Sequence, residues 1–130
     1  MNQKELDDSL IQAADGDFQS AKELLMAGAN PNGMPLIMAI QCGAFDIVSL
    51  FIRYGVDLNT CYSGTTPLIR AVTSGYPEIV QLLIANGAKT NLKDIEGKTA
   101  EDWLSESNMP RLTVQNKSLI ALYLNGTRQI

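Results

Sequence analysis

The chain has 130 residues, of which 45% are hydrophobic and 18% are charged, which fits one soluble globular domain and excludes an intrinsically disordered chain. Ten Lys and Arg residues against 14 Asp and Glu residues give a net charge of −4, so no nucleic-acid partner is expected, because phosphate binding needs clustered cations. The chain has no histidine, which excludes Ser–His and Cys–His nucleophiles and His-ligated zinc.

The N-terminal eight residues are polar and mostly acidic, with no apolar stretch behind a basic start, so no secretory signal is expected. Apolar stretches such as residues 35–40 and 82–85 are far shorter than the roughly 20 residues that a membrane-spanning helix needs. We therefore expect a cytoplasmic protein without a membrane partner, in which Cys42 and Cys61 are reduced thiols.

Three segments align without gaps, and each is an apolar helical pattern that ends at a glycine. They are residues 18–32, 45–59 and 77–91, with Gly28, Gly55 and Gly87. Glycine at such a place is typical of the left-handed residue after a helix C-terminus, and Gly126 is expected to play the same role. The glycines recur every 27 to 39 residues, which indicates a stacked solenoid in which no unit buries its apolar face alone.

A shorter helix precedes each longer one, at residues 10–14, 35–42 and 67–74. These helices are expected to end at Gly16, Gly43 and Gly75. In the third unit, Thr66 is expected to cap the helix and Pro67 to occupy its first position.

Residues 64–91 contain Gly-x-Thr-Pro-Leu, an inner glycine, Glu-Ile-Val-x-Leu-Leu and Gly-Ala-x-x-Asn, and they closely resemble an ankyrin repeat. The resemblance extends over roughly residues 6–104 and is weaker beyond them. It implies an all-α ankyrin-repeat solenoid of stacked helix-turn-helix units, with β-turn fingers at one edge. We expect a single domain, residues 1–130, with approximate units 1–32, 33–59, 60–92 and a degenerate 93–130.

The sequence also departs from the ankyrin pattern. Ile37 and Ile69 stand where the family usually has His, and the finger that precedes Pro35 is clipped. Met34 replaces the capping Thr, so the start of that helix depends on Pro35 alone. In the fourth unit, the pattern breaks at Met109-Pro110, and a last helix is expected near residues 115–124.

Acidic pairs are the nearest candidates for acid–base chemistry, at Asp7-Asp8, Asp15 with Asp17, and Glu101-Asp102. They fall at expected helix starts and loops, where a carboxylate stabilises free backbone N–H groups, so we interpret them as structural. The sequence has no phosphate-loop or calcium-loop fingerprint. We therefore predict no enzyme activity, no catalytic residue, no cofactor and no metal site.

The ankyrin resemblance implies that turn residues beside the central glycine, and residues just before the end of the short helix, point away from the stack. These residues are Tyr62, Ser63, Thr65, Thr73, Ser74, Ile95, Glu96, Lys98, Glu106 and Ser107, with Gln41 and Cys42 in the second unit. We expect the partner to contact the first eight of these residues, Tyr62, Ser63, Thr65, Thr73, Ser74, Ile95, Glu96 and Lys98, with Gln41 at the margin of the contact. Tyr62 and Ile95 either form an anchor patch or fold back over the neighbouring finger, and Trp103 is either core or an anchor that faces the groove.

The function implied by the resemblance is non-catalytic binding of another protein by a monomer, through the fingers and the concave short-helix face. Residues 1–66 carry a charge of −5 and residues 89–130 carry +1, so the acidic end either steers a basic partner or is a solvated face. One alternative is a small cytosolic inhibitor or immunity protein that neutralises a partner enzyme or toxin. A second alternative is a self-assembling structural subunit.

Overall fold

The computed structural model describes residues 1–106 and 113–126, and the chain divides into two compact units, Met1–Asp57 and Leu58–Ile130. The single domain expected from the sequence stays a prediction. The predicted break at Met109-Pro110 and the candidate Ser107 lie outside the described residues.

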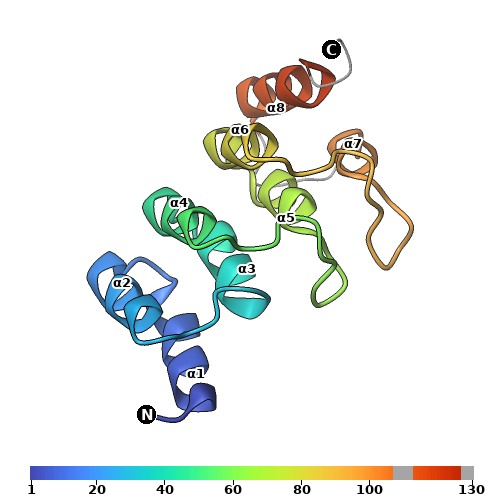
Figure 1. Cartoon of the computed structure of the whole chain (residues 1–130). Helices are drawn as coiled ribbons and strands as arrows, with labels where there is room; N and C mark the ends of the chain where they lie inside the picture. Colours follow the sequence, from blue (N-terminus) through green and yellow to red (C-terminus); the bar gives the residue numbers. More distant parts are fainter. Residues whose placement is uncertain (107–112, 127–130) are drawn as a thin grey trace. The chain divides into compact units, whose positions relative to one another are not determined.

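The N-terminal unit contains two helix pairs. Its helices are α1 (Gln3–Ala13), α2 (Phe18–Met26), α3 (Met34–Gln41) and α4 (Phe45–Arg53). In each pair the two helices pack on each other, and the pairs stack because α1 also contacts α3 and α2 contacts α4 (Figure 1). The stack buries Leu10, Ile40 and Phe51 completely. This unit thus has the repeating helix-turn-helix arrangement that the sequence predicts.

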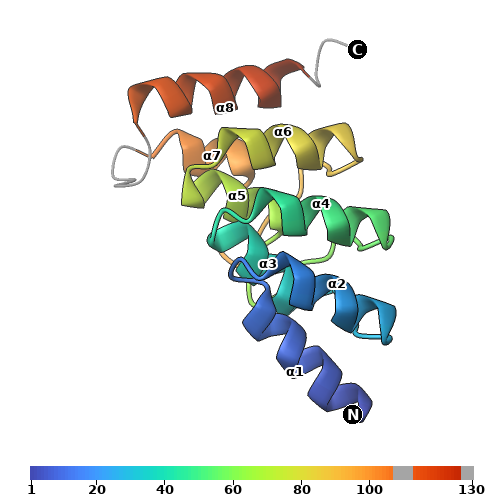
Figure 2. The same ribbon diagram turned by 90° about the vertical axis from the view of Figure 1, so that its left-hand side faces the viewer.

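The C-terminal unit repeats this arrangement, but its second pair combines a short helix with a long one. Its described helices are α5 (Pro67–Ser74), α6 (Pro77–Ala85), α7 (Ala100–Leu104) and α8 (Val114–Gly126). Helix α5 packs against α6 and α7, and α8 lies along α6 (Figure 2). Val72, Val80 and Leu83 are fully buried between them. No β-strand occurs among residues 1–106 and 113–126, so the fold is an all-α solenoid, as predicted.

The helix starts agree with the sequence in α5 and α3 but not in α1. The Thr66 side chain accepts a hydrogen bond from the Ile69 N–H at 3.2 Å, whereas Gly33 gives α3 no side-chain cap. Helix α1 begins at Gln3 instead of near residue 10, because the Asn2 side chain accepts the Glu5 N–H at 2.8 Å and caps it. None of the described helices is long and apolar enough to cross a membrane.

Glycines end the long helices at the three predicted places. Gly28, Gly55 and Gly87 have φ angles of 105°, 77° and 99°, in the left-handed region that favours glycine. Gly126 differs from the expectation, because it is the last residue of α8 and has no positive φ. Burial of Leu124 holds the final turn of α8 in the helix up to that glycine.

Side-chain amides tie each repeat to the next within both units. The Asn32 Oδ1 accepts the Asp57 N–H at 2.7 Å in the N-terminal unit. In the C-terminal unit, the Asn59 Oδ1 accepts the Lys89 N–H at 2.8 Å, and its Nδ2 donates to the Gly87 carbonyl at 3.2 Å. The asparagine that ends the Gly-x-x-x-Asn segment therefore fixes the loop after the next long helix.

Candidate protein-binding site on the finger turns

The first finger of the C-terminal unit is a hairpin with a two-residue loop, closed by backbone hydrogen bonds. The Tyr62 N–H donates to the Thr65 carbonyl at 2.7 Å, and the Thr65 N–H returns to the Tyr62 carbonyl at 3.2 Å. Ser63 and Gly64 have φ angles of 53° and 82°, the pair of positive values that a type I′ turn requires. The turn therefore holds the Tyr62 and Ser63 side chains at its exposed end.

The second finger, residues 94–99, is organised by the carboxylate of Asp94. The Asp94 Oδ1 accepts the Glu96 N–H at 2.9 Å and the Lys98 N–H at 3.0 Å. The Asp94 Oδ2 accepts the indole N–H of Trp103 at 2.6 Å. One side chain thus satisfies two turn amides and joins the finger to α7.

Burial of Asp94 acts to raise its pKa, but the N–H donors of Lys98, Trp103 and Glu96, with the charge of Lys98, outweigh it, so the pKa is lowered from 3.8. The carboxylate is therefore ionised at neutral pH and keeps its three acceptor contacts.

Lys98 belongs to the same network, and its side chain lies over the ring of Trp103. Its ammonium lies 4.4 Å from the centre of the indole ring and 2.5 Å from the Glu106 carboxylate. The hydrogen bond to Glu106 is the main reason that the pKa of Lys98 is raised. Lys98 therefore stabilises the base of the finger.

The two fingers are joined directly. The Ile95 N–H donates to the Gly64 carbonyl at 3.2 Å, so the backbone of one finger is bonded to that of the other. A Cβ atom at Gly64 would lie 3.0 Å from the Ile95 Cγ2, closer than the two side chains can approach without moving. Glycine is therefore needed at this position both for its positive φ and for the approach of Ile95.

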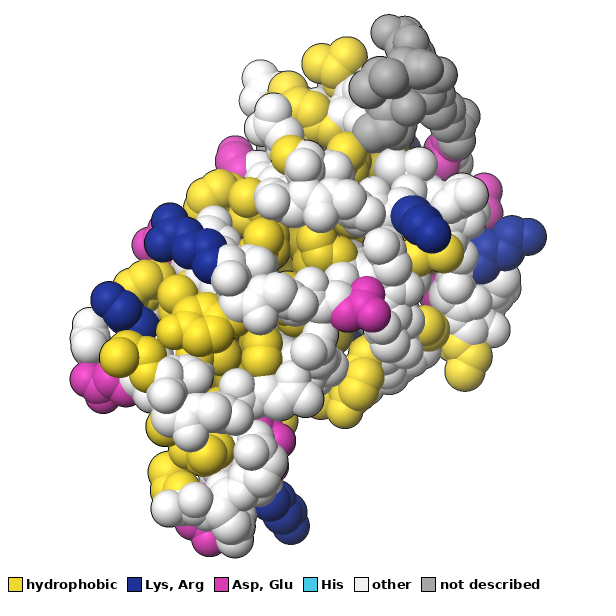
Figure 3. Space-filling view, viewed as in Figure 1, with side chains coloured by type: hydrophobic (Ala, Val, Ile, Leu, Met, Phe, Trp, Pro, Cys, Tyr) yellow, Lys and Arg dark blue, Asp and Glu magenta, His cyan; other side chains and the backbone are white. Residues whose placement is uncertain are grey.

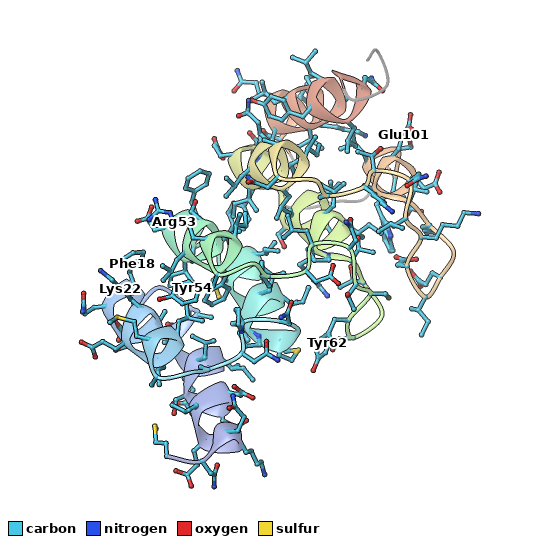
Figure 4. All side chains as sticks on the ribbon, viewed as in Figure 1. Phe18, Lys22, Arg53, Tyr54, Tyr62 and Glu101 are labelled. Atoms are coloured by element: carbon cyan, nitrogen blue, oxygen red, sulfur yellow. The ribbon has the colours of Figure 1, made fainter. Side chains whose placement is uncertain are left out.

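The joined fingers expose two apolar side chains at their tips. Ile95 is 83% exposed and Tyr62 is 41% exposed, although both are large hydrophobic residues. Hydrophobic side chains protrude at the ends of both fingers in Figure 3, and Tyr62 lies at the free end of the first finger in Figure 4. The packing of the unit does not bury these two side chains, which makes them candidates for a partner contact.

The structure divides the predicted contact residues into exposed and buried ones. Tyr62, Ser63, Ile95 and Glu96 are exposed on the fingers, and Gln41 is exposed at the end of α3 in the N-terminal unit. Lys98 and Thr73 are half-buried, and the Thr73 hydroxyl donates to the Arg70 carbonyl.

Thr65 and Ser74 do not point into solvent as expected; each is 7% exposed. Thr65 closes the base of the hairpin, and Ser74 lies in the last turn of α5, so neither side chain is open to a partner.

Asp94 and the structural role of Trp103 were missed by the sequence reasoning. An Asp three residues before a glycine is a turn signal, because its carboxylate can accept nearby backbone N–H groups, and Asp94 precedes Gly97 in this way. Trp103 is half-buried, and its indole N–H is bonded to Asp94. Its position therefore lies between the two alternatives, since Trp103 is neither fully buried in the core nor a free anchor for a partner.

One carboxylate in each of two acidic pairs has a structural role. Asp17 caps α2 by accepting the Ser20 N–H and hydroxyl, and its bonds with the Ser20 side chain and backbone lower its pKa. Asp102 and Thr99 form a reciprocal capping box on α7, which also lowers the pKa of Asp102 through the Thr99 backbone bond. No group of three residues able to hold a metal ion occurs in the parts of the chain that the structure describes.

Comparison with known proteins agrees with this geometry. The family described as ankyrin repeats (3 copies) matches residues 10–94, which is well over half of the chain. The chain belongs to the ankyrin-repeat family. Ankyrin repeats generally mediate protein–protein interaction, and the family is generally non-catalytic. The resemblance predicted from the sequence is therefore confirmed.

Several curated ankyrin-repeat proteins and regulators are similar to parts of this chain. The putative ankyrin repeat protein FPV216 of Fowlpox virus (strain NVSL) is 43% identical over 60 residues, 45% of this chain and 20% of the viral protein. Human protein phosphatase 1 regulatory subunit 27 is 30% identical over 89 residues, 67% of this chain and 58% of that protein.

The phosphocholine transferase AnkX of Legionella pneumophila is 36% identical over 64 residues, but these cover only 7% of that enzyme. This chain therefore spans less than two thirds of the length of each relative named here.

Proposed function

We propose that the chain binds a partner protein through the joined fingers, with Tyr62, Ser63, Ile95 and Glu96 as its exposed contacts. The observation that carries this proposal is the exposure of Tyr62 and Ile95 on two turns whose backbones are hydrogen-bonded to each other. Lys98 and Thr73, which are half-buried, are proposed as secondary contacts, whereas Thr65 and Ser74 are buried. Gln41 is proposed as a marginal contact on the other unit.

The proposed mechanism is recognition by a preformed surface. The first finger is fixed by two backbone hydrogen bonds, and the second by backbone hydrogen bonds of Asp94 together with its carboxylate, so little backbone entropy is lost on association. Ile95 supplies an apolar plug, and Tyr62 supplies an aromatic face with a hydroxyl at its end. Glu96 adds a charged rim that sets orientation more than affinity.

The similarity to a regulatory subunit of protein phosphatase 1 favours one finer version of this function. In that version, the bound protein is an enzyme whose activity changes when the fingers occupy its surface, as the inhibitor alternative proposes. We further propose a monomer of one domain in the cytoplasm, and a monomeric mass in solution at micromolar concentration would argue against a self-assembling subunit.

Affinity capture with three baits tests the finger surface. Wild type, Tyr62→Ala/Ile95→Asp and the matched control Val114→Ala/Leu122→Asp would each be incubated with soluble extract of the producing cell. The control removes two exposed apolar side chains, 84% and 64% exposed, from α8 of the same unit. Mass spectrometry should find a protein retained by wild type and control but lost from the folded finger variant. Equal retention by all three baits would contradict the finger proposal.

A further inference from the structure

The N-terminal unit has a second open surface, which is a groove between α1 and α2. Its volume is about 450 Å³, and both helices line it. The apolar part of the lining comes from Leu6 and Ala13 on α1 and from Leu24 and Ala27 at α2. These residues lie three to seven positions apart on each helix, so each helix presents one continuous face to the groove.

Three carboxylates lie along the same groove. Asp15 and Asp17 come from the turn between the two helices, and Glu23 comes from the middle of α2. The unit has eight acidic and three basic residues, and none of the three bases lines the groove. Asp17 is occupied by capping α2, and one oxygen of Glu23 accepts the Gln19 side-chain N–H at 3.1 Å. Asp15 and the other Glu23 oxygen therefore have the most capacity for an external cation.

The shape of the groove suits a helix. Two packed helices form a channel between their side-chain ridges, into which the apolar stripe of a third helix can fit. Helix α1 has 11 residues, so a helix of about three turns would follow its length of about 16 Å. Met1 stands at one end, 76% exposed, and its flexible thioether can adapt to different apolar side chains.

We propose that the groove between α1 and α2 binds a basic amphipathic helix of a partner protein, at a site separate from the fingers. The apolar stripe of that helix lies on Leu6, Leu24 and Ala27. Lys or Arg residues beside the stripe pair with Asp15 and Glu23. The charge of the groove selects against acidic helices, which have the same apolar stripe but repel both carboxylates.

The probe is a synthetic peptide of about 14 residues made of Leu, Lys and Ala, with Leu at helical spacing and Lys on both sides of the stripe. A second peptide has Glu in place of each Lys. A third has the composition of the first in an order that breaks the stripe. Calorimetric titration of the full chain should show binding of the first peptide and at least tenfold weaker binding of the other two.

A pair of charge-matched variants locates the site. Asp15→Lys/Glu23→Lys changes the groove, whereas Asp8→Lys/Asp46→Lys makes the same change in net charge at exposed positions outside it. The groove variant should bind the basic peptide at least tenfold more weakly than wild type, and the control should change by less than about threefold. Circular dichroism would verify that both variants keep the helical fold.

Chemical-shift mapping on the wild-type chain gives a readout that does not depend on any variant. The peptide should shift the amide signals of Leu6, Ser9, Leu24 and Ala27 and leave those of residues 62–65 and 94–98 in place. No binding, equal binding of the permuted peptide, equal loss in both variants, or shifts at the fingers would each overturn the proposal. Tyr62→Ala/Ile95→Asp should bind the peptide like wild type, so this test and the finger test fail independently.

Discussion

The two fingers of the C-terminal unit reach one exposed edge by different means. The first is closed by a pair of backbone hydrogen bonds between Tyr62 and Thr65, while the second combines backbone hydrogen bonds of Asp94 to Lys98 and Gly97 with two contacts of the Asp94 side chain. Both fingers therefore need a glycine with a positive φ, and the second depends in addition on one carboxylate. Different substitutions should therefore destabilise these two turns, although both are exposed.

The largest expected effect lies in the core of the same unit and separates loss of the fingers from general loss of the fold. Leu83 on α6 is fully buried, so Leu83→Ala should lower the free energy of unfolding by about 2–5 kcal/mol. Urea denaturation followed by circular dichroism measures this change. A loss below about 1 kcal/mol would mean that α6 is not the packed centre of the unit.

The next effect breaks the first finger at its glycine. Gly64→Ala should cost about 2–3 kcal/mol, because the new Cβ meets strain at a φ of 82° and approaches Ile95 at 3.0 Å.

Gly97→Ala in the second finger is the matched control, since Gly97 has a φ of 77° but no atom within 4 Å of the new Cβ. It should cost only the strain, about 1–2 kcal/mol. Equal losses in the two variants, measured by urea denaturation, would show that Ile95 makes room for the new Cβ atom at no cost.

The sequence predicted the first finger better than the second, for a physical reason. Ser63-Gly64 and Thr66-Pro67 are local signals, because a turn and a helix cap are decided by residues a few positions apart. The glycines after the long helices are equally local. Exposure of Ile95 and burial of Ser74 depend on neighbouring elements, so local pattern alone could not decide them.

The Asp94 network shows a further limit. The turn contacts of Asp94 could be predicted from its spacing to Gly97, but its bond to the Trp103 indole depends on where α7 packs. The groove between α1 and α2 was missed because the sequence placed the first helix near residues 10–14 and left out the capped start at Asn2. Long-range packing and an unrecognised cap account for these two differences.

A smaller effect breaks the second finger at its carboxylate. Asp94→Ala should cost about 1–2 kcal/mol, because it leaves two turn N–H groups and the indole N–H of Trp103 without their acceptor. Glu96→Ala removes an exposed carboxylate from the same turn and should stay within about 0.5 kcal/mol of wild type. Thermal unfolding of the two variants measures the difference in stability. Equal stability would mean that the Asp94 carboxylate does not hold the second finger.

The pH dependence of folding stability should also distinguish the second finger from the first. Since the folded-state pKa of Asp94 lies below its ordinary value of 3.8, its contribution to stability is complete above that value and is lost as the pH falls through the lowered pKa. Trp103 is the only tryptophan, so its fluorescence reports the loosening of the second finger. Acid titration should shift this signal in wild type and not in Asp94→Asn; identical titrations would contradict the assignment.

The central claim is tested most directly by titrating the captured partner, once purified, against three forms of the chain. Tyr62→Ala/Ile95→Asp should keep its stability within about 0.5 kcal/mol of wild type, because both side chains are exposed. Its affinity should nevertheless fall at least tenfold, while Val114→Ala/Leu122→Asp should change affinity by less than about threefold. Unchanged affinity in the folded finger variant, or a larger loss in the α8 control, would contradict the account.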